Sequence, residues 1–262
     1  MTLISSKLAA ETFIVPIVYG GGDLPEITEF DCDILMWDGK PQYANVLDNW
    51  IPEAPYFQDR GFNMPSITPK DVQQQIIDYC VECVLALGFK QGNFHMEAWM
   101  TTIGPVLIEC NPRVGGASIF DLHKQVYGVD PSVNFFLSAM GIPINPPRFE
   151  TPQCARLFYL VTAHKTGVFE GETFLDKAKE NEHVISTVYF KHKGDKVTGL
   201  DKGVPEWIGQ FDMKGDAKDL ESLIRELDDL VKESTEEAGR QTAGEVVNFK
   251  PNRRRSTLAD LE

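Results

Sequence analysis

The feature that most constrains this fold is a pair of apolar, strand-like segments on either side of residues 101–105. Each segment contains one glutamate, Glu97 in the first and Glu109 in the second. Side chains alternate between the two faces of a strand, so a hairpin centred on Ile103 places the glutamates directly opposite each other, with Cβ atoms about 5 Å apart. A loop with an even number of residues would instead shift the register by one and send them to opposite faces.

Glutamates that face each other on half-buried strands repel unless one is protonated or a cation lies between them. Mg²⁺ binds carboxylate oxygens together with phosphate oxygens and water, so the pair predicts a platform for MgATP. In the same register Asn111 lies opposite His95 and adds an amide oxygen as a further ligand. Arg113, two residues beyond, is placed to contact a phosphate or a developing oxyanion. In the shifted register, Glu97 and Glu109 would be ordinary solvent-facing residues.

His95 shares a strand face with Glu97, which leaves two interpretations open. It either orients a substrate or phosphate, or it is a hydrogen-bonded structural histidine. Two nearby cysteines also have two interpretations, since Cys80 and Cys83 form a Cys-x-x-Cys motif. Both fall within a predicted helix on its apolar side, so core packing is the better interpretation than a redox pair.

Residues 24–49 predict a β-hairpin, because the Asp-Gly pair at 38–39 supplies a tight turn between two strand-like runs. Residues 47–66 are rich in proline, aromatic and charged side chains and predict a long irregular loop. A helix is expected from Thr68 as N-cap to Gly88. Its predicted apolar face consists of Ile76, Cys80, Cys83, Val84 and Leu87.

The predicted fold class is α/β (α+β), with a largely antiparallel sheet, packed helices and a small additional α+β region. Helices are expected at about 118–127, ended by Gly128, and after Asp130-Pro131. Later strands are expected near 154–162 and 184–191. An amphipathic helix should then present Leu220, Leu223, Ile224, Leu227, Leu230 and Val231 on one face.

Four regions follow from this pattern along the chain. They are an N-terminal segment (1–23), a lobe that carries the glutamate hairpin (24–150), a smaller α+β region (151–236) and a polar tail (237–262).

Charge and cysteine content limit the expected partners and location. The net charge of −14 argues against binding to nucleic acid or anionic membranes, because the long-range field repels polyanions. The sequence contains no run of 18 or more apolar residues, so no membrane span is predicted. Five cysteines without a disulfide pattern favour a reducing, cytoplasmic location.

The stretch "GNFHMEAWMTTIGPVLIECNPRVGG" resembles the metal-binding end of the ATP-grasp fold, which has a Glu on one strand and Glu-x-Asn-x-Arg on the next. "IECNPRVGG" followed by "DLHKQVYGVD" is similar to ATP-grasp amino-acid ligases of the carnosine synthase type. The resemblance covers residues 28–145 strongly and extends loosely to about 235. It implies the C-terminal lobe of the ATP-grasp fold, corresponding to the C-terminal half of such a ligase.

Carried to this chain, the resemblance implies that Glu97 and Glu109 bind Mg²⁺, with Mn²⁺ as an alternative. Asn111 would bind the metal or a phosphate. Arg113 would be catalytic, touching the transferred phosphate or the acyl phosphate. Glu29 would help to recognise an amino group of the substrate.

The implied reaction joins an amino-acid carboxylate to an amine. ATP phosphorylates the carboxylate, and the amine attacks the resulting acyl phosphate to form an amide. Alternatives are an ATP-grasp ligase with another substrate, or a truncated, non-catalytic remnant that binds a partner. The expected partners are small amino-acid substrates. The chain is also expected to form a homo-oligomer or to receive its missing N-terminal half from another chain.

Overall fold

The computed structural model describes residues 15–52, 55–116 and 118–244 of the chain. The strands are β1 (Tyr19–Gly21), β2 (Leu24–Trp37), β3 (Lys40–Trp50), β4 (Gly61–Met64), β5 (Gly92–Thr101), β6 (Gly104–Asn111), β7 (Ala155–Thr162), β8 (Gly167–Phe169), β9 (Val184–Tyr189), β10 (Lys196–Val197), β11 (Trp207–Gly215) and β12 (Thr242–Gly244). The helices are α1 (Lys70–Ala86), α2 (Ile119–Tyr127), α3 (Pro131–Ala139), α4 (Asp176–Glu180) and α5 (Leu220–Arg240), with a short 3-10 turn η1 (Ala217–Asp219).

Nine strands form one sheet in the order β6-β5-β2-β3-β4-β7-β11-β9, with β1 paired to β2. Every pairing in this sheet is antiparallel. A small second sheet has the order β10-β8-β12. The predicted fold class, with a largely antiparallel sheet and packed helices, is therefore confirmed.

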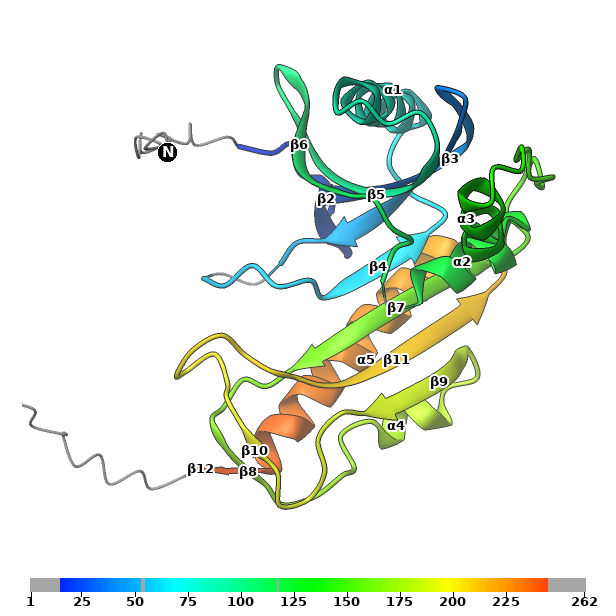
Figure 1. Ribbon diagram of the computed structural model, residues 1–262. Coiled ribbons are helices and arrows are strands. Elements are labelled where there is room, and N and C mark those ends of the chain that lie inside the picture. Colours follow the sequence, from blue (N-terminus) through cyan, green and yellow to red (C-terminus); the bar gives the residue numbers. More distant parts are fainter. Residues whose placement is uncertain (1–14, 53–54, 117, 245–262) are drawn as a thin grey trace, which may run out of the picture.

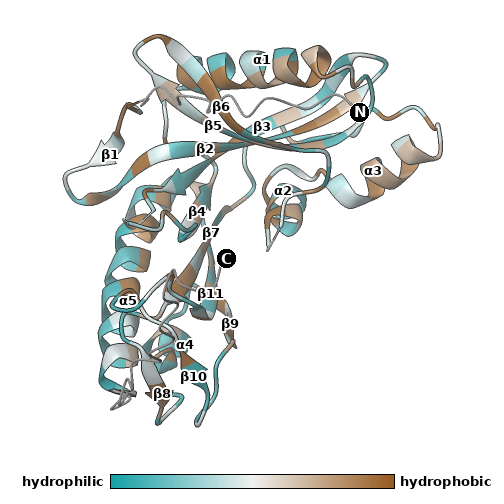
Figure 2. Cartoon of the chain, turned by 60° about the vertical axis from the view of Figure 1, so that its left-hand side comes forward, coloured by the Kyte–Doolittle hydropathy of each residue, from teal (hydrophilic) through white to brown (hydrophobic). Residues whose placement is uncertain are grey.

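Helices cover both faces of the large sheet. Ile76 of α1 and Leu227 of α5 belong to one continuous apolar core on the first face. Leu122 of α2 packs with Leu47 and Phe158 on the other face. Figure 1 shows α1 over the end of the sheet that contains β5 and β6, and α5 along β7 and β11. Figure 2 shows α2 and α3 on the side of the sheet opposite α1.

The first hairpin forms as the sequence predicts. β2 and β3 pair antiparallel, with Trp37 opposite Lys40. Asp38 and Gly39 occupy the turn with φ values of 49° and 73°. Positive φ at both central residues matches the twist of paired strands, which explains the Asp-Gly pair at this point.

Two predictions between the hairpins are wrong. Residues 47–66 do not form one long loop, because β3 continues to Trp50 and β4 occupies Gly61–Met64. Thr68 is not the N-cap of α1, since Pro69 holds that position without a side-chain cap. The hydroxyl of Thr68 instead donates to Oδ1 of the buried Asp48, 3.0 Å away.

The apolar face of α1 is confirmed with one exception. Ile76, Cys80 and Val84 are fully buried, and Cys83 packs against the same core. Leu87 is 58% exposed because it lies past the last helical turn, next to Gly88 with φ of 87°. The helix therefore ends where the glycine predicts, and its last apolar residue falls outside the core.

The predicted helices at 118–127 and after Asp130 are confirmed. Gly128 ends α2 with φ of 79°. The carboxylate of Asp130 accepts a hydrogen bond from the backbone N–H of Val133 at the start of α3.

The sheet continues beyond residue 150, because β4 pairs with β7 and β7 pairs with β11. β7 and β9 occupy the predicted positions, whereas β11 was not predicted. The predicted tail boundary at 237 is wrong, since α5 continues to Arg240 and β12 covers Thr242–Gly244. The amphipathic face of α5 supports a helix even where its exposed side is entirely polar.

At the N-terminal side, β1 joins the sheet, so part of the predicted 1–23 segment belongs to the fold. Residues 1–14 and 245–262, including most of both predicted terminal segments, lie outside the described residues. Within the described part of the chain, no helix is long and apolar enough to cross a membrane. All five cysteines are free thiols.

Candidate active site

The glutamate hairpin has the predicted pairing but not the predicted loop. Thr101 pairs with Gly104, so the loop contains two residues rather than an odd number. The register then shifts between Ala98, opposite Leu107, and Glu97, opposite Glu109. Ile108 is the extra residue of this β-bulge, which returns Glu109 to the face of Glu97. A loop with an even number of residues should place Glu97 and Glu109 on opposite faces. The bulge restores their pairing.

The pairing extends into rows of polar side chains across three adjacent strands. Asp31 of β2 lies opposite Glu97, which lies opposite Glu109. Neighbouring strands are about 4.8 Å apart, so the three carboxyl-bearing residues form one row across the sheet. Residues that pair directly share a face, and this face is the one opposite α1.

The next row places Asp33 opposite His95 and His95 opposite Asn111. Oδ1 of Asp33 lies 3.1 Å from Nδ1 of His95, and Oδ2 lies 2.9 Å from Nε2 of His123 on α2. Nδ1 of His123 lies 2.7 Å from the hydroxyl of Tyr43 on β3. All four side chains are buried.

The ionised carboxylate of Asp33 determines which nitrogen atoms of the two histidines carry protons. An ionised carboxylate only accepts hydrogen bonds, so Nδ1 of His95 and Nε2 of His123 both carry protons toward Asp33. Nε2 of His95 lies 3.7 Å from Oε1 of Glu97, so the ring is fixed with its second nitrogen toward the carboxyl row.

Electrostatics keep this pair of side chains charged. Burial alone would lower the pKa of His95, but the charge and hydrogen bond of Asp33, with the charges of Asp31 and Glu97, raise it to about 10. Burial disfavours ionisation of Asp33, but the charges and hydrogen bonds of His95 and His123 outweigh it and hold its pKa below the usual range. The floor of the site therefore contains an imidazolium bound to a carboxylate.

Three other carboxyl groups near the cavity have raised pKa values, because burial outweighs the charges that oppose it. Burial raises the pKa of Glu29 to about 7, and the charges of Asp59 and Glu97 add to the effect. Burial also raises the pKa of Asp31 and, less strongly, that of Glu97, where His95 opposes the shift. A cation that enters this group of carboxyl groups would favour their ionised forms.

A cavity of about 340 Å³ opens beside the rows. Of the six predicted site residues, His95, Glu97 and Arg113 line it, together with Asp31 and Asp59. Oδ1 of Asp31 is buried there and has no hydrogen-bond partner among the residues that the structure describes.

The other three predicted residues lie close to the cavity along the strands. Glu109 is exposed, and Asn111 is partly buried. Nδ2 of Asn111 has no hydrogen-bond partner in the described part of the chain. Glu29 is half-buried on β2, opposite Trp99 and one position along the strand face from Asp31.

Arg113 follows β6 and is exposed, and its Nη1 donates to the carbonyl of Val114, 3.1 Å away. Sequence reasoning missed Asp31, Asp33 and His123. The Asp-x-Asp spacing after Glu29 puts all three acidic residues on one strand face and was the available signal for the first two. No local signal marks His123, which comes from a helix 90 residues beyond Asp33.

The residues present fit Mg²⁺ held jointly with a phosphate ligand. In the described residues no group of three or more His, Cys, Asp or Glu side chains is arranged to enclose a metal. Mg²⁺ does not require such a cage, because it commonly takes one or two carboxylates and completes its shell with phosphate and water. The facing pair Glu97 and Glu109 supplies that number of carboxylates, and the unpartnered amide of Asn111 lies in the next row.

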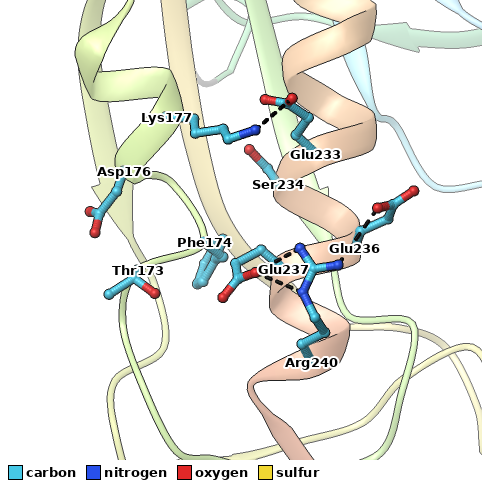
Figure 3. A pocket seen from close by; sticks show the side chains of 9 residues that line it. All are labelled: Thr173, Phe174, Asp176, Lys177, Glu233, Ser234, Glu236, Glu237 and Arg240. Carbon is cyan, nitrogen blue, oxygen red and sulfur yellow. Dashed lines mark hydrogen bonds and ion pairs between the residues drawn. The ribbon is translucent and has the colours of Figure 1, made fainter.

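A second pocket, of about 330 Å³, lies between α4 and the C-terminal part of α5 (Figure 3). Its charged side chains pair with one another. Nζ of Lys177 lies 2.7 Å from Oε1 of Glu233, and Arg240 bonds Glu237. None of the six predicted site residues lines this pocket.

The family comparison matches the region that holds the site. Residues 12–121 match the ATP-grasp domain, and this range includes all six predicted site residues. The chain contains an ATP-grasp domain. The resemblance noted from the glutamate hairpin is thereby confirmed.

Individual proteins with a similar sequence or fold include ligases. The chain is 34% identical to carnosine synthase 1 of Gallus gallus over 139 residues, which cover 52% of this chain and 15% of that protein. Its fold is similar to an L-amino acid ligase from Bacillus licheniformis, with a TM-score of 0.66 and 20% identity over 78% of this chain and 50% of that one.

A third similarity is to another solved structure. Phosphoribosylglycinamide synthetase from Anaerococcus prevotii matches with a TM-score of 0.60 and 16% identity, over 79% of this chain and 52% of that one. The chain thus spans a small part of the curated relative and about half of each solved structure.

Proposed function

We propose that this ATP-grasp domain takes part in ATP-dependent ligation of an amino-acid carboxylate to an amine, through an acyl phosphate. The observation that carries the proposal is the direct pairing of Glu97 with Glu109, with Asn111 in the next row and Arg113 at the end of the strand. A pair of carboxylates beside an amide and a guanidinium suits a metal-bound polyphosphate.

Each residue has a role in this proposal. Glu97 and Glu109 hold Mg²⁺, or Mn²⁺, which also prefers oxygen ligands. When bound, the metal supplies positive charge beside the transferred phosphoryl group. Asn111 binds the metal or a phosphate oxygen, and Arg113 stabilises the charge on the phosphoryl group as it moves to the substrate carboxylate.

His95 adds a fixed positive charge to the floor of the site. Its hydrogen bond to Asp33 holds the ring, and its second nitrogen faces the carboxyl row. A donor that is already oriented costs little reorganisation when charge develops on a phosphoryl or acyl oxygen. The amine then attacks the acyl carbon, and phosphate leaves.

The similarity to carnosine synthase 1 supports amino acids as the substrate class. The L-amino acid ligase and the phosphoribosylglycinamide synthetase support the fold alone, because their identities are 20% and 16%. Half-buried Glu29, beside the cavity, is proposed to contact an amino group of the substrate. An ATP-grasp ligase with another carboxylate substrate is the alternative.

Calorimetric titration with MgATP tests the nucleotide site. We expect binding to the unmodified chain and a loss of at least ~10-fold in affinity for Glu97→Ala/Glu109→Ala. The matched control is Glu82→Ala/Glu180→Ala, which removes two charges from exposed helix positions. Equal affinity in all three proteins would refute the metal pair.

The chemical step needs a separate measurement. With MgATP and a panel of amino acids, hydroxylamine should trap an acyl phosphate as a hydroxamate while ADP is released. Nucleotide binding without hydroxamate or ADP for any amino acid would contradict amino-acid ligation and leave a binding role for the domain.

A further inference from the structure

Asp31 is a buried carboxyl group that the proposed magnesium site does not use. Its side chain lines the cavity beside Glu97, yet the residue is only 1% exposed. Among residues 15–52, 55–116 and 118–244, Oδ1 has no hydrogen-bond partner. Leaving a buried polar atom unpaired is unfavourable, so such an atom at a cavity wall indicates a ligand that pairs with it.

We propose that Asp31 is a substrate-binding residue that accepts a hydrogen bond from the ammonium group of the amino-acid substrate. This inference rests on the proposed ligase function for the identity of the ligand. Asp31 lines the cavity, whereas Glu29, which is also proposed to contact an amino group of the substrate, does not.

The position of Asp31 in its row supports this occupant. Asp31 lies one strand from Glu97 and two strands from Glu109, which corresponds to about 5 Å and about 10 Å across the sheet. The proposed metal and phosphate lie beside Glu97 and Glu109, the other two residues of the row. An amino acid that presents its carboxylate to them carries its ammonium on a neighbouring carbon, so an acceptor one strand away matches the substrate.

The charges around the cavity lead to the same conclusion. Asp59 and Glu97 add two further acidic groups to the lining. Of the cations there, His95 is hydrogen-bonded to Asp33, and Arg113 donates to the carbonyl of Val114.

Within the described residues, the partner of Asp31 on β3 is the apolar, fully buried Leu47. A ligand that reaches Oδ1 must therefore bring its own hydrogen-bond donor.

The test compares ligands that differ only in this group. L-alanine and L-lactate form one pair, and L-leucine and (S)-2-hydroxy-4-methylpentanoate form another. Each is titrated into the full chain by calorimetry, with and without MgADP. We expect the amino acid to bind at least ~10-fold more tightly than its hydroxy acid in one or both pairs, and Asp31→Asn to reduce this preference to below ~3-fold.

Separate readouts distinguish this inference from the ligase proposal. MgATP affinity should be the same in Asp31→Asn and the unmodified chain, because the pair Glu97 and Glu109 is intact. Asp78→Asn, an exposed site on α1, is the control and should leave both preference and affinity unchanged. Loss of MgATP binding in the unmodified chain would count against the ligase proposal, while titrations without nucleotide still test Asp31.

Two results would overturn the inference. One is an unmodified chain without preference for the amine in either pair, and the other is an Asp31→Asn chain that retains the preference. If Asp31→Asn does not fold, Asp31→Ser replaces it, since a smaller polar side chain also removes the carboxyl group. A change in stability alone, with the preference retained, would assign Asp31 a structural role.

Discussion

Nδ1 of His95 lies 3.1 Å from Oδ1 of Asp33, and the two residues are 5% and 3% exposed. The pair joins the β5–β6 hairpin to β2, and His123 extends the contact to α2. An imidazole at this position would ordinarily be neutral above pH ~6.5. Here His95 is already positively charged before a substrate binds.

Asp33→Asn should restore an ordinary histidine titration. The pKa of His95 is raised to about 10, so its charge contributes stability below pH ~6.5 that is lost as the pH rises through about 10. NMR of the imidazole carbon-bound protons should show no His95 titration between pH 5 and 8 in the unmodified chain. In Asp33→Asn the titration should enter that range. A normal midpoint in the unmodified chain would contradict the ion pair.

Glu29→Gln should change the pH dependence of stability. The pKa of Glu29 is raised to about 7, so the folded state binds this proton more tightly than the unfolded state. The unmodified chain should lose stability as the pH rises from about 4.5 to about 7, and the variant should lose less. Urea unfolding at pH 5 and pH 8 measures this difference. An equal change in stability between pH 5 and pH 8 in the two proteins would show that Glu29 titrates normally.

Asp48→Ala should destabilise the fold strongly. The buried carboxylate of Asp48 accepts hydrogen bonds from Ser66, Thr68, Asn63 and the backbone N–H of Ile67. Its removal leaves several buried donors unpaired, at a cost of about 2–4 kcal/mol. Urea unfolding beside Glu82→Ala, which changes an exposed site, provides the comparison. Similar unfolding midpoints for both variants would contradict a structural role for Asp48.

Two adjacent glycines should respond differently to alanine. A Cβ at Gly115 would lie 2.7 Å from Cγ2 of Ile119 and 3.1 Å from Nδ1 of His95, whereas a Cβ at Gly116 meets no atom within 4 Å. We expect Gly115→Ala to cost about 1–3 kcal/mol and to shift the His95 NMR signal. Gly116→Ala should stay within ~0.5 kcal/mol of the unmodified chain. Equal stability of the two variants would indicate that Ile119 and His95 move freely.

Local patterns predicted a large part of the fold because they act over short distances. The Asp-Gly turn, Gly88, Gly128 and the Asp130 cap each set the backbone at their own position. The strand β11 was missed because Gly209 and the polar residues between its apolar ones weaken the strand pattern. A helix cap at Thr68 was wrong because a buried carboxylate 20 residues away binds its hydroxyl.

For the site, the sequence by itself determined which residues share a strand face, since the alternation of side chains is a property of the extended backbone. It therefore identified Glu97 and Glu109 as possible partners. They face each other because of a bulge at Ile108, which no loop rule predicts and which the packing of the sheet sets. The tertiary structure also placed β2 beside β5 and α2 over Asp33. Such contacts join residues far apart in the chain, so they depend on the packing of the whole sheet rather than on any local pattern.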